Sequence, residues 1–134
     1  MARNYYRVML GSKAKFFEDG FKGNFIGVDY EIPEDLTGKF PDNWRDFTEK
    51  YIPVYLNSHP DKSKIAAGLA CGTIWTVCYG YNESDLILVP NGQGTYHICE
   101  VTGAYYYVPG GILPHRRPVR WYEKTINRED MSYS

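Results

Sequence analysis

The stretch of sequence that decides the fold reads Leu86-Ile-Leu-Val-Pro-Asn-Gly-Gln-Gly-Thr-Tyr-His-Ile-Cys-Glu-Val-Thr102. It opens on the apolar run Leu86–Val89, which is typical of a buried strand. Residues 91–94 form a glycine-rich turn motif, and residues 95–102 can return as the second strand. The stretch therefore predicts a β-hairpin.

Further strands are predicted on both sides of this hairpin. They are rich in aromatic and β-branched residues and cover residues 4–10, 24–30, 105–108 and 118–122. Gly27 stands at the centre of the second of these segments. A glycine inside a strand marks a bulge or the close approach of another group to the backbone.

Two helices are predicted between the first strands and the hairpin, after a shorter one near the start. Ser12 can cap a short helix that runs through Phe17. Asp42 opens a longer helical pattern, in which Pro53 is expected to kink or shorten the helix. One face of this pattern carries the aromatic residues Trp44, Phe47, Tyr51 and Tyr55, and we expect Trp44 to pack the helix on the sheet.

Residues 63–75 form the next helical pattern, which is built from small residues. Gly68 and Gly72 cost helix stability but would allow another element to approach closely. Taken together, the segments predict an α+β fold: a small, mixed, partly closed β-barrel of five to six strands with two to three flanking helices.

Length and composition favour a single folded domain over residues 1–134. Hydrophobic residues make up 43% of the 134 residues and the net charge is −1, which is unlike a disordered chain. No apolar run reaches the roughly 18 residues of a membrane span. The three cysteines, Cys71, Cys78 and Cys99, do not form a secreted disulfide pattern. We therefore expect a soluble, cytoplasmic protein.

Aromatic residues and charge are distributed unevenly. The chain has 13 Tyr, 6 Phe and 3 Trp, and rings of this kind serve either a core or a surface that meets a ligand. Basic residues are in excess over residues 1–22 and 116–128, whereas acidic residues are in excess over residues 29–49. If the two ends lie together, their basic residues would form a face suited to a nucleic-acid backbone.

Common catalytic motifs are absent from the sequence. There is no P-loop, no G-x-S-x-G elbow and no G-x-G-x-x-G that opens a helix. The three histidines stand apart from one another, and a zinc site made with the cysteines would need irregular spacing. The sequence therefore favours a binding domain without a metal or other cofactor over an enzyme.

An ordered series of motifs resembles the PUA/EVE-like superfamily, especially the N-terminal specificity modules of modification-dependent restriction systems of the McrB and Mrr kind. The series spans residues 5–122, which leaves residues 123–134 as a tail or linker toward a missing effector part. Val28 stands where an aromatic residue is frequent in the family, and Ser84 where a glycine precedes the aspartate. The motifs are Phe25-Ile-Gly-Val-Asp29, Asp35-Leu-Thr37, Trp75-x-Val, Ser84-Asp85-Leu-Ile-Leu-Val-Pro, Gly94-x-Tyr-x-Ile-x-Glu100-Val-Thr-Gly-x-Tyr-x-Tyr107 and His115-Arg-Arg-Pro-Val-Arg-Trp121.

The resemblance implies recognition of a modified base, methylated for example, that is flipped from double-stranded DNA into an aromatic pocket. We expect Asp29 to accept a hydrogen bond from an exocyclic amine and Gly27 to let the base approach the strand. The candidate walls of the pocket are Phe25, Tyr30 and Trp75, with Tyr105 and Tyr107 as weaker candidates. Each has a structural alternative: the rings can be core, and Asp29 can cap a turn near Pro33.

Four cations are candidates for contacts to phosphates: Lys62, Lys64, Arg116 and Arg117. Arg116 and Arg117 adjoin a proline, so we expect them to reach outward from a loop or strand start. The expected partners are modified DNA and the nuclease or motor domain or subunit of a restriction system. Two alternatives stay open, namely an RNA-binding module of the same fold and a small nucleotide-processing enzyme that uses Asp29 or Glu100 as an acid.

Overall fold

A computed structural model describes residues 5–131 of the chain. Asn4, the first residue of the first predicted strand, and the last three residues of the predicted tail lie outside the described residues. None of the helices in the described range has both the length and the apolar character needed to cross a bilayer.

The predicted hairpin is confirmed and forms the middle of the sheet. Strands β3 and β4 pair antiparallel, with Val89 opposite His97. The side chain of Asn91 closes the turn, because its Oδ1 accepts a hydrogen bond from the backbone N–H of Gln93 at 2.8 Å. The strands are β1 (Tyr5–Arg7), β2 (Phe25–Val28), β3 (Leu86–Pro90), β4 (Thr95–Val101), β5 (Tyr106–Tyr107) and β6 (His115–Asn127).

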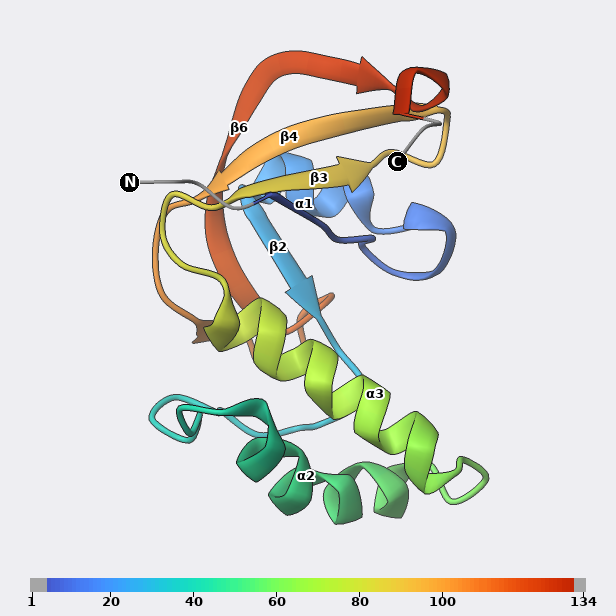
Figure 1. Cartoon of the computed structure of the whole chain (residues 1–134), viewed down its shortest axis with the longest axis vertical. Coiled ribbons are helices and arrows are strands. Elements are labelled where there is room, and N and C mark those ends of the chain that lie inside the picture. The colour runs from blue at the N-terminus through green and yellow to red at the C-terminus, as the bar shows by residue number, and fades with distance from the viewer. Residues whose placement is uncertain (1–4, 132–134) are drawn as a thin grey trace.

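The sheet is curled and open, and β6 causes the curl. The strand order is β1-β3-β4-β6-β2, with β1 parallel to β3 and the other pairs antiparallel. The first residues of β6 pair with β2 and β5, whereas its later residues pair with β4. Figure 1 shows that β2 consequently leaves the plane of the other strands and runs down toward helix α3 (Lys64–Trp75). The α+β class is confirmed, with strands in the predicted number and flanking helices. The sheet is a curled, open half-barrel, and the predicted partial closure into a barrel is not confirmed.

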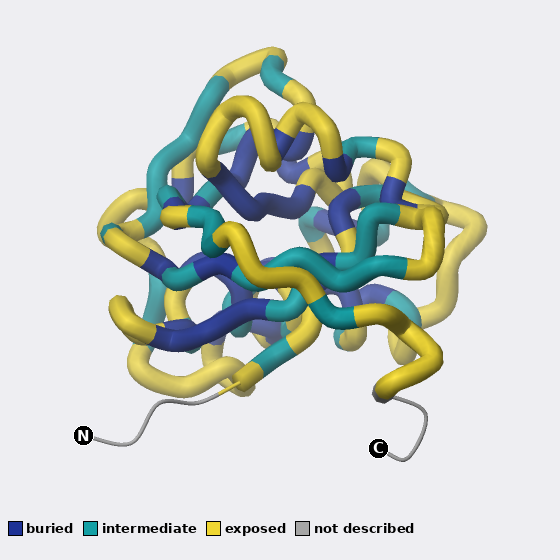
Figure 2. The backbone as a smooth tube through the Cα atoms, turned by 90° about the horizontal axis from the view of Figure 1, so that it is seen from above, coloured by how far each residue is buried: buried dark blue, intermediate teal, exposed yellow. Residues whose placement is uncertain are grey.

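Helices α2 and α3 lie beneath the sheet, α3 closer to it and α2 below (Figure 1). In Figure 2, buried residues follow the strands and inner turns, while exposed residues lie mostly on the outer loops and turns. A π-helical turn, η2, continues α3. The helical elements are η1 (Ser12–Ala14), α1 (Phe17–Gly23), α2 (Trp44–Ser58), α3 (Lys64–Trp75), η2 (Thr76–Gly80) and η3 (Arg128–Met131).

The bounds of α3 are as predicted, and Ser63 caps it by accepting a hydrogen bond from the N–H of Ala66. The prediction at Ser12 was wrong: a short 3-10 turn forms there, with the left-handed Lys13 inside it, and the α-helix begins only at Phe17. A left-handed residue breaks the helical repeat, so Ser12 cannot nucleate a continuous helix.

Helix α2 also differs from the prediction at both ends. Asn43, rather than Asp42, caps it, and the helix runs through Pro53 to Ser58. Its predicted inner face is formed by Phe47, Tyr51 and Tyr55, which are buried. Trp44 does not pack on the sheet: its side chain is 46% exposed, and the guanidinium of Arg45 lies 4.8 Å from its ring.

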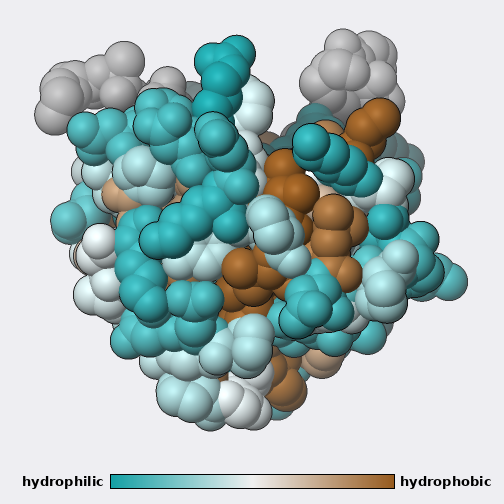
Figure 3. Space-filling view, turned by 90° about the horizontal axis from the view of Figure 1, so that it is seen from below, coloured by the Kyte–Doolittle hydropathy of each residue, from teal (hydrophilic) through white to brown (hydrophobic). Residues whose placement is uncertain are grey.

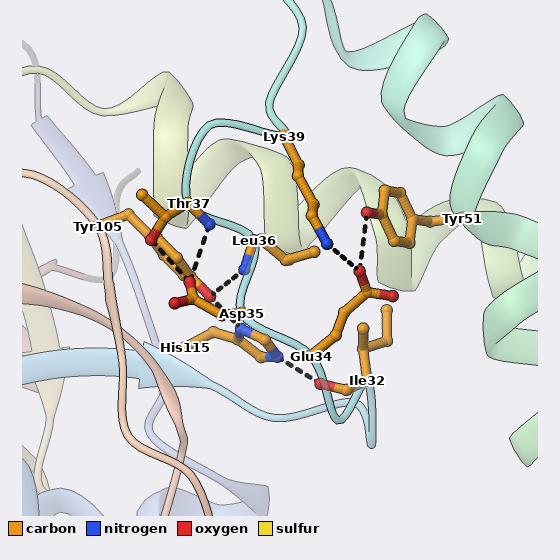
Figure 4. A network of polar contacts seen from close by, with 9 residues as sticks. All are labelled: Ile32, Glu34, Asp35, Leu36, Thr37, Lys39, Tyr51, Tyr105 and His115. Atoms are coloured by element: carbon orange, nitrogen blue, oxygen red, sulfur yellow. Dashed lines mark hydrogen bonds and ion pairs between the residues drawn. The ribbon is translucent and has the colours of Figure 1, made fainter.

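Two buried polar residues of β6 hold the connector before α2 and the end of the α3–η2 helix on the sheet. His115 and Arg117 lie on the same inward face of the strand and are 0% and 4% exposed. Because a carbonyl can only accept, the Nε2–H of His115 donates to the Ile32 oxygen at 2.7 Å. Its Nδ1 then accepts from the Tyr105 hydroxyl at 2.8 Å, and that oxygen accepts from the N–H of Leu36 (Figure 4). This chain of bonds fixes the connector between β2 and α2.

Arg117 fixes the end of the α3–η2 helix in the same way. Its Nε donates to the oxygen of Gly103 at 2.8 Å, and its Nη1 donates to the oxygens of Val77, Cys78 and Tyr81 at 2.8–3.3 Å. The last carbonyls of a helix lack partners within the helix and carry partial negative charge. A cation at this end therefore satisfies them and favours the helix dipole.

The burial of His115 makes stability depend on pH. Burial lowers the pKa of His115 below its ordinary value of 6.5, so the unfolded chain binds more protons as the pH falls through that value. The free energy of unfolding is therefore expected to hold above about pH 6.5 and to decline below it. Urea unfolding across about pH 8 to about pH 5 measures this decline.

His115→Gln is expected to lower the free energy of unfolding at about pH 8 by roughly 1–3 kcal/mol, because a buried polar group loses its partner. The same variant should lose less stability on acidification than the natural chain. Burial also lowers the pKa of His97, which stays in this variant and keeps its own share of the decline. An acid slope that is unchanged in His115→Gln would contradict the assignment.

Candidate functional site

The end of β2 opens into a hollow of about 650 Å³, here called the β2-end hollow. This volume lies within the roughly 300–1,000 Å³ that is usual for ligand sites. Three predicted base-binding residues, Gly27, Asp29 and Tyr30, are brought together in its wall. The rest of the lining is Met9, Gly11, Ser12, Lys15, Phe16, Val28, Glu31, His59 and Leu113.

Asp29 is exposed at the edge of this hollow. Its Oδ1 accepts a hydrogen bond from the backbone N–H of Glu31 at 3.0 Å, so the turn-capping alternative is realised. Its Oδ2 has no hydrogen-bond partner within residues 5–131. One carboxylate can therefore hold the turn and still accept a hydrogen bond from a ligand.

The backbone around the hollow is held in an uncommon conformation. Tyr30, Glu31 and Leu113 line it with φ angles of 50°, 56° and 48°, and Lys13 and Ala14, in the loop between two lining residues, have φ angles of 56° and 60°. L-residues other than glycine occupy this left-handed region rarely and at an energetic cost. Such residues gather at binding and catalytic sites, where the surrounding structure holds them in place.

One lysine lines the hollow, and two others follow the lining residue His59 in the sequence. Lys15 is part of its lining, with its Nζ 5.0 Å from the centre of the Phe16 ring. His59 lies 3.3 Å from the carboxylate of Glu31, and Lys62 follows in the turn that closes on the His59 carbonyl. The side chains of Lys13, Lys62 and Lys64 are exposed. The predicted phosphate contacts at Lys62 and Lys64 thus lie on a segment that adjoins the hollow.

A second hollow of about 600 Å³, here called the α3 groove, adjoins the first. Met9, Val28 and Tyr30 line both. The other wall of the groove includes Trp44, Leu69 and the two helix glycines. Figure 3 shows a hydrophobic patch among hydrophilic residues on the face seen from below, to which helices α2 and α3 are closest.

The glycines of α3 do not serve the close packing that the sequence predicts. No atom lies within 4 Å of the position that a Cβ would take at Gly72, and at Gly68 the nearest atom is Cδ1 of Ile52 at 3.9 Å. Both positions instead face the α3 groove. At Gly27 the predicted close approach is real, but the approaching atoms are carbonyl oxygens. Those of His115 and Leu113 lie 2.8 and 3.0 Å from the position that a Cβ would occupy.

The remaining predicted ring residues do not line the β2-end hollow. Phe25 is buried, and the guanidinium of Arg116 covers its ring at 3.7 Å. Trp75 donates from Nε1 to the oxygen of Pro41 at 2.9 Å and packs against the helix. Tyr105 and Tyr107 pack on His115. These four rings therefore belong mainly to the core and its edges, because each is occupied by a partner within the chain.

The expectation that Arg116 and Arg117 reach outward was wrong. Arg117 is buried among carbonyl oxygens, as described above. Arg116 donates from Nε to the oxygen of Leu113 and from Nη2 to that of Ile112, while it stacks on Phe25. Both guanidinium groups stabilise loops. Glu100, the other candidate acid, pairs with Arg120 at 2.7 Å and is not part of the hollow's lining.

Sequence reasoning missed several residues of the site, among them Met9, Lys15, Phe16, His59 and Leu113. Only the excess of basic residues near the N-terminus pointed toward Lys15. His59 and Leu113 reach the hollow through tertiary contacts, so no local pattern marks them.

Within residues 5–131, His, Cys, Asp and Glu side chains form no group of three that could hold a metal ion. Comparison of the chain with protein-family models, curated proteins and solved structures found no match.

Gly72 and Gly27 differ in the space around a Cβ, so replacing each with alanine should change stability in opposite directions. Gly72→Ala is expected to raise the free energy of unfolding by about 0.5–1 kcal/mol, because alanine is the better helix former and nothing opposes its methyl group. Gly27→Ala is expected to lower it by roughly 1–3 kcal/mol, since its Cβ would press on two backbone oxygens. Urea unfolding of both variants measures the difference. A Gly27→Ala chain as stable as the natural one would show that the close approach is not a packing constraint.

Proposed function

We propose that the chain is a DNA-binding module that receives one modified base, flipped out of a duplex, in the β2-end hollow. The observation that carries this proposal is the convergence at one hollow of an available carboxylate oxygen and of left-handed backbone. Methylation is the modification that we favour, because the hollow has apolar as well as polar walls.

The walls supply the contacts that a flipped base needs. Tyr30 and Phe16 offer ring surfaces, and base–aromatic stacking contributes about 1–3 kcal/mol per base. Oδ2 of Asp29 can accept a hydrogen bond from an exocyclic amine, such as that of adenine or cytosine. Met9, Val28 and Leu113 can enclose a methyl group without leaving a polar atom unpaired.

The lysines around the hollow are suited to the phosphates on either side of the flipped base. Lys13 and Lys15 approach from the loop before α1, and Lys62 and Lys64 from the turn before α3. They replace Arg116 and Arg117 in this role, because those guanidinium groups are engaged by carbonyls. A few phosphate contacts of this kind fit a chain of near-zero net charge, whose non-specific binding should be weak.

The same proposal includes the PUA/EVE-like interpretation of the fold and a non-catalytic role for the chain. The curled sheet with helices at one end is compatible with that interpretation. Cleavage or translocation of the DNA would then belong to a nuclease or motor domain or subunit of a restriction system. RNA is the alternative ligand, and it is an arm of the experiment below.

Binding assays should show preference for one modified duplex over the unmodified one. Electrophoretic shifts at fixed salt would compare methylated, hydroxymethylated and plain DNA with matched RNA. Asp29→Asn is expected to weaken binding of the modified DNA by about 1.5–3 kcal/mol, as for a hydrogen bond to a charged group. Asp61→Asn, an equal change of charge beside Lys62, is the control. Equal affinity for modified and plain DNA in the natural chain would refute the proposal.

The lysines should act on every DNA alike. Lys15→Glu combined with Lys62→Glu is expected to weaken modified and plain duplexes by the same factor and to make the slope of log K against log salt shallower by about 2. Lys124→Glu, an exposed lysine near the end of β6, is the matched control. A loss confined to modified DNA would place the lysines in base reading and would contradict their assignment to phosphates.

A further inference from the structure

A third hollow, of about 550 Å³, lies on a different part of the surface and is here called the Arg117 hollow. It shares no lining residue with the β2-end hollow. Four rings line it, those of Phe40, Tyr79, Tyr81 and Tyr105, together with the polar residues Arg117 and Glu83. The function proposed above makes no use of this site.

Arg117 gives the hollow a donor that no residue of the described range uses. The residue is only 4% exposed, and its Nε and Nη1 are taken by carbonyl oxygens. Its Nη2 donates to no residue of the described range, and no carboxylate of that range lies within ion-pair distance. This N–H can therefore donate to a ligand in the hollow.

The rings form an aromatic wall beside this donor. Phe40 and Tyr79 are stacked at 5.7 Å with an interplanar angle of 14°, and Phe40 meets Tyr105 edge to face at 5.2 Å. The hydroxyl groups of Tyr79 and Tyr105 are already bound to Asp42 and His115. Tyr79 and Tyr105 can therefore offer a ligand their ring atoms rather than their hydroxyls, which favours an aromatic ligand.

Glu83 adds an acceptor to the same lining and is exposed. The polar groups of the hollow are thus a guanidinium N–H, which can donate, and a carboxylate, which can accept. A carbonyl next to a ring N–H matches this pair. Guanine, uracil and thymine carry that edge, whereas adenine carries an amine where the carbonyl would be.

We propose that the Arg117 hollow binds a nucleobase with such a keto edge, its carbonyl oxygen on Nη2 of Arg117 and its ring N–H on the carboxylate of Glu83. The base can belong to a free nucleotide or to a nucleic-acid strand, since the recognised edge is the same. This site does not depend on a modified base in the β2-end hollow.

Titration of the ¹⁵N-labelled chain with nucleoside monophosphates tests the proposal. GMP and UMP should shift the amide signals of the Arg117 hollow, including Gly38, Asn82 and Ala104, and AMP should bind at least about tenfold more weakly. An oligonucleotide of the same bases forms a second arm: signals that move only with it identify the strand as the source, and signals that also move with the nucleotides identify the base alone as sufficient. Absence of shifts at this hollow with both would overturn the proposal.

Two variants locate the bound base without disturbing Arg117. Ala104→Leu, at an exposed position of the lining, should block the hollow and abolish these shifts while the chain stays folded. Glu83→Gln should reduce the preference for GMP over AMP severalfold, because a neutral amide replaces the acceptor. Unchanged binding in Ala104→Leu would overturn the assignment.

Tyr30→Ala separates this inference from the proposed function. It changes the β2-end hollow and should leave the nucleotide shifts at the Arg117 hollow as they are. Loss of modified-DNA binding with retained GMP binding is the expected pattern for this variant. If the natural chain shows no preference for modified DNA but binds GMP at the Arg117 hollow, only the first proposal is refuted.

Discussion

The inward face of β6 carries His115 and Arg117 two residues apart, and the rest of the structure depends on the hydrogen bonds that these two side chains make. A strand that faces a core usually carries apolar residues there, because burying a polar group without a partner costs free energy. Here the polar atoms reach carbonyl oxygens of two inserted segments, the connector at Ile32 and the end of η2 at Tyr81. One short stretch of a strand thereby positions both inserted segments.

Arg116 and Arg117 donate to carbonyl oxygens of the chain, and this limits which cations can contact a negatively charged ligand. A guanidinium that satisfies buried carbonyls cannot also extend to a phosphate, so other cations must contact the phosphates of a ligand. Lys15 lies in the loop before α1, and Lys62 lies in the turn after His59. Both loops also contribute lining residues of the β2-end hollow. In the acidic connector, in contrast, the carboxylates are bound within the chain. Asp35 accepts a hydrogen bond from Thr37, and Glu34 accepts from Lys39 and Tyr51 (Figure 4).

Local patterns predicted the elements well and the site only in part. The hairpin and α3 follow from turn residues and from the Ser63 cap, which act within a few residues of one another. Phe25 is covered by Arg116, and Arg117 is bound to the carbonyl of Val77. Both contacts join segments that are distant in the chain, so no local pattern predicts them. At Ser12 the prediction failed because a capping residue favours a helix start but does not suffice for one: the left-handed Lys13 interrupts the helical repeat. Asp29 and Tyr30 were found because their motif lies at a strand end, where side chains leave the core.

The π-helical turn η2 links the hollows on its two sides. Thr76 and Val77 line the α3 groove, Cys78 and Tyr79 line the Arg117 hollow, and Tyr81 lines both. Tyr81 is buried: it stacks on Tyr6 at 4.5 Å, and burial raises its pKa to about 12. Because Arg117 ties the carbonyls of this same turn to β6, a shift of η2 would change both hollows and strain the strand together. The two hollows therefore share η2 and Tyr81 as a common wall.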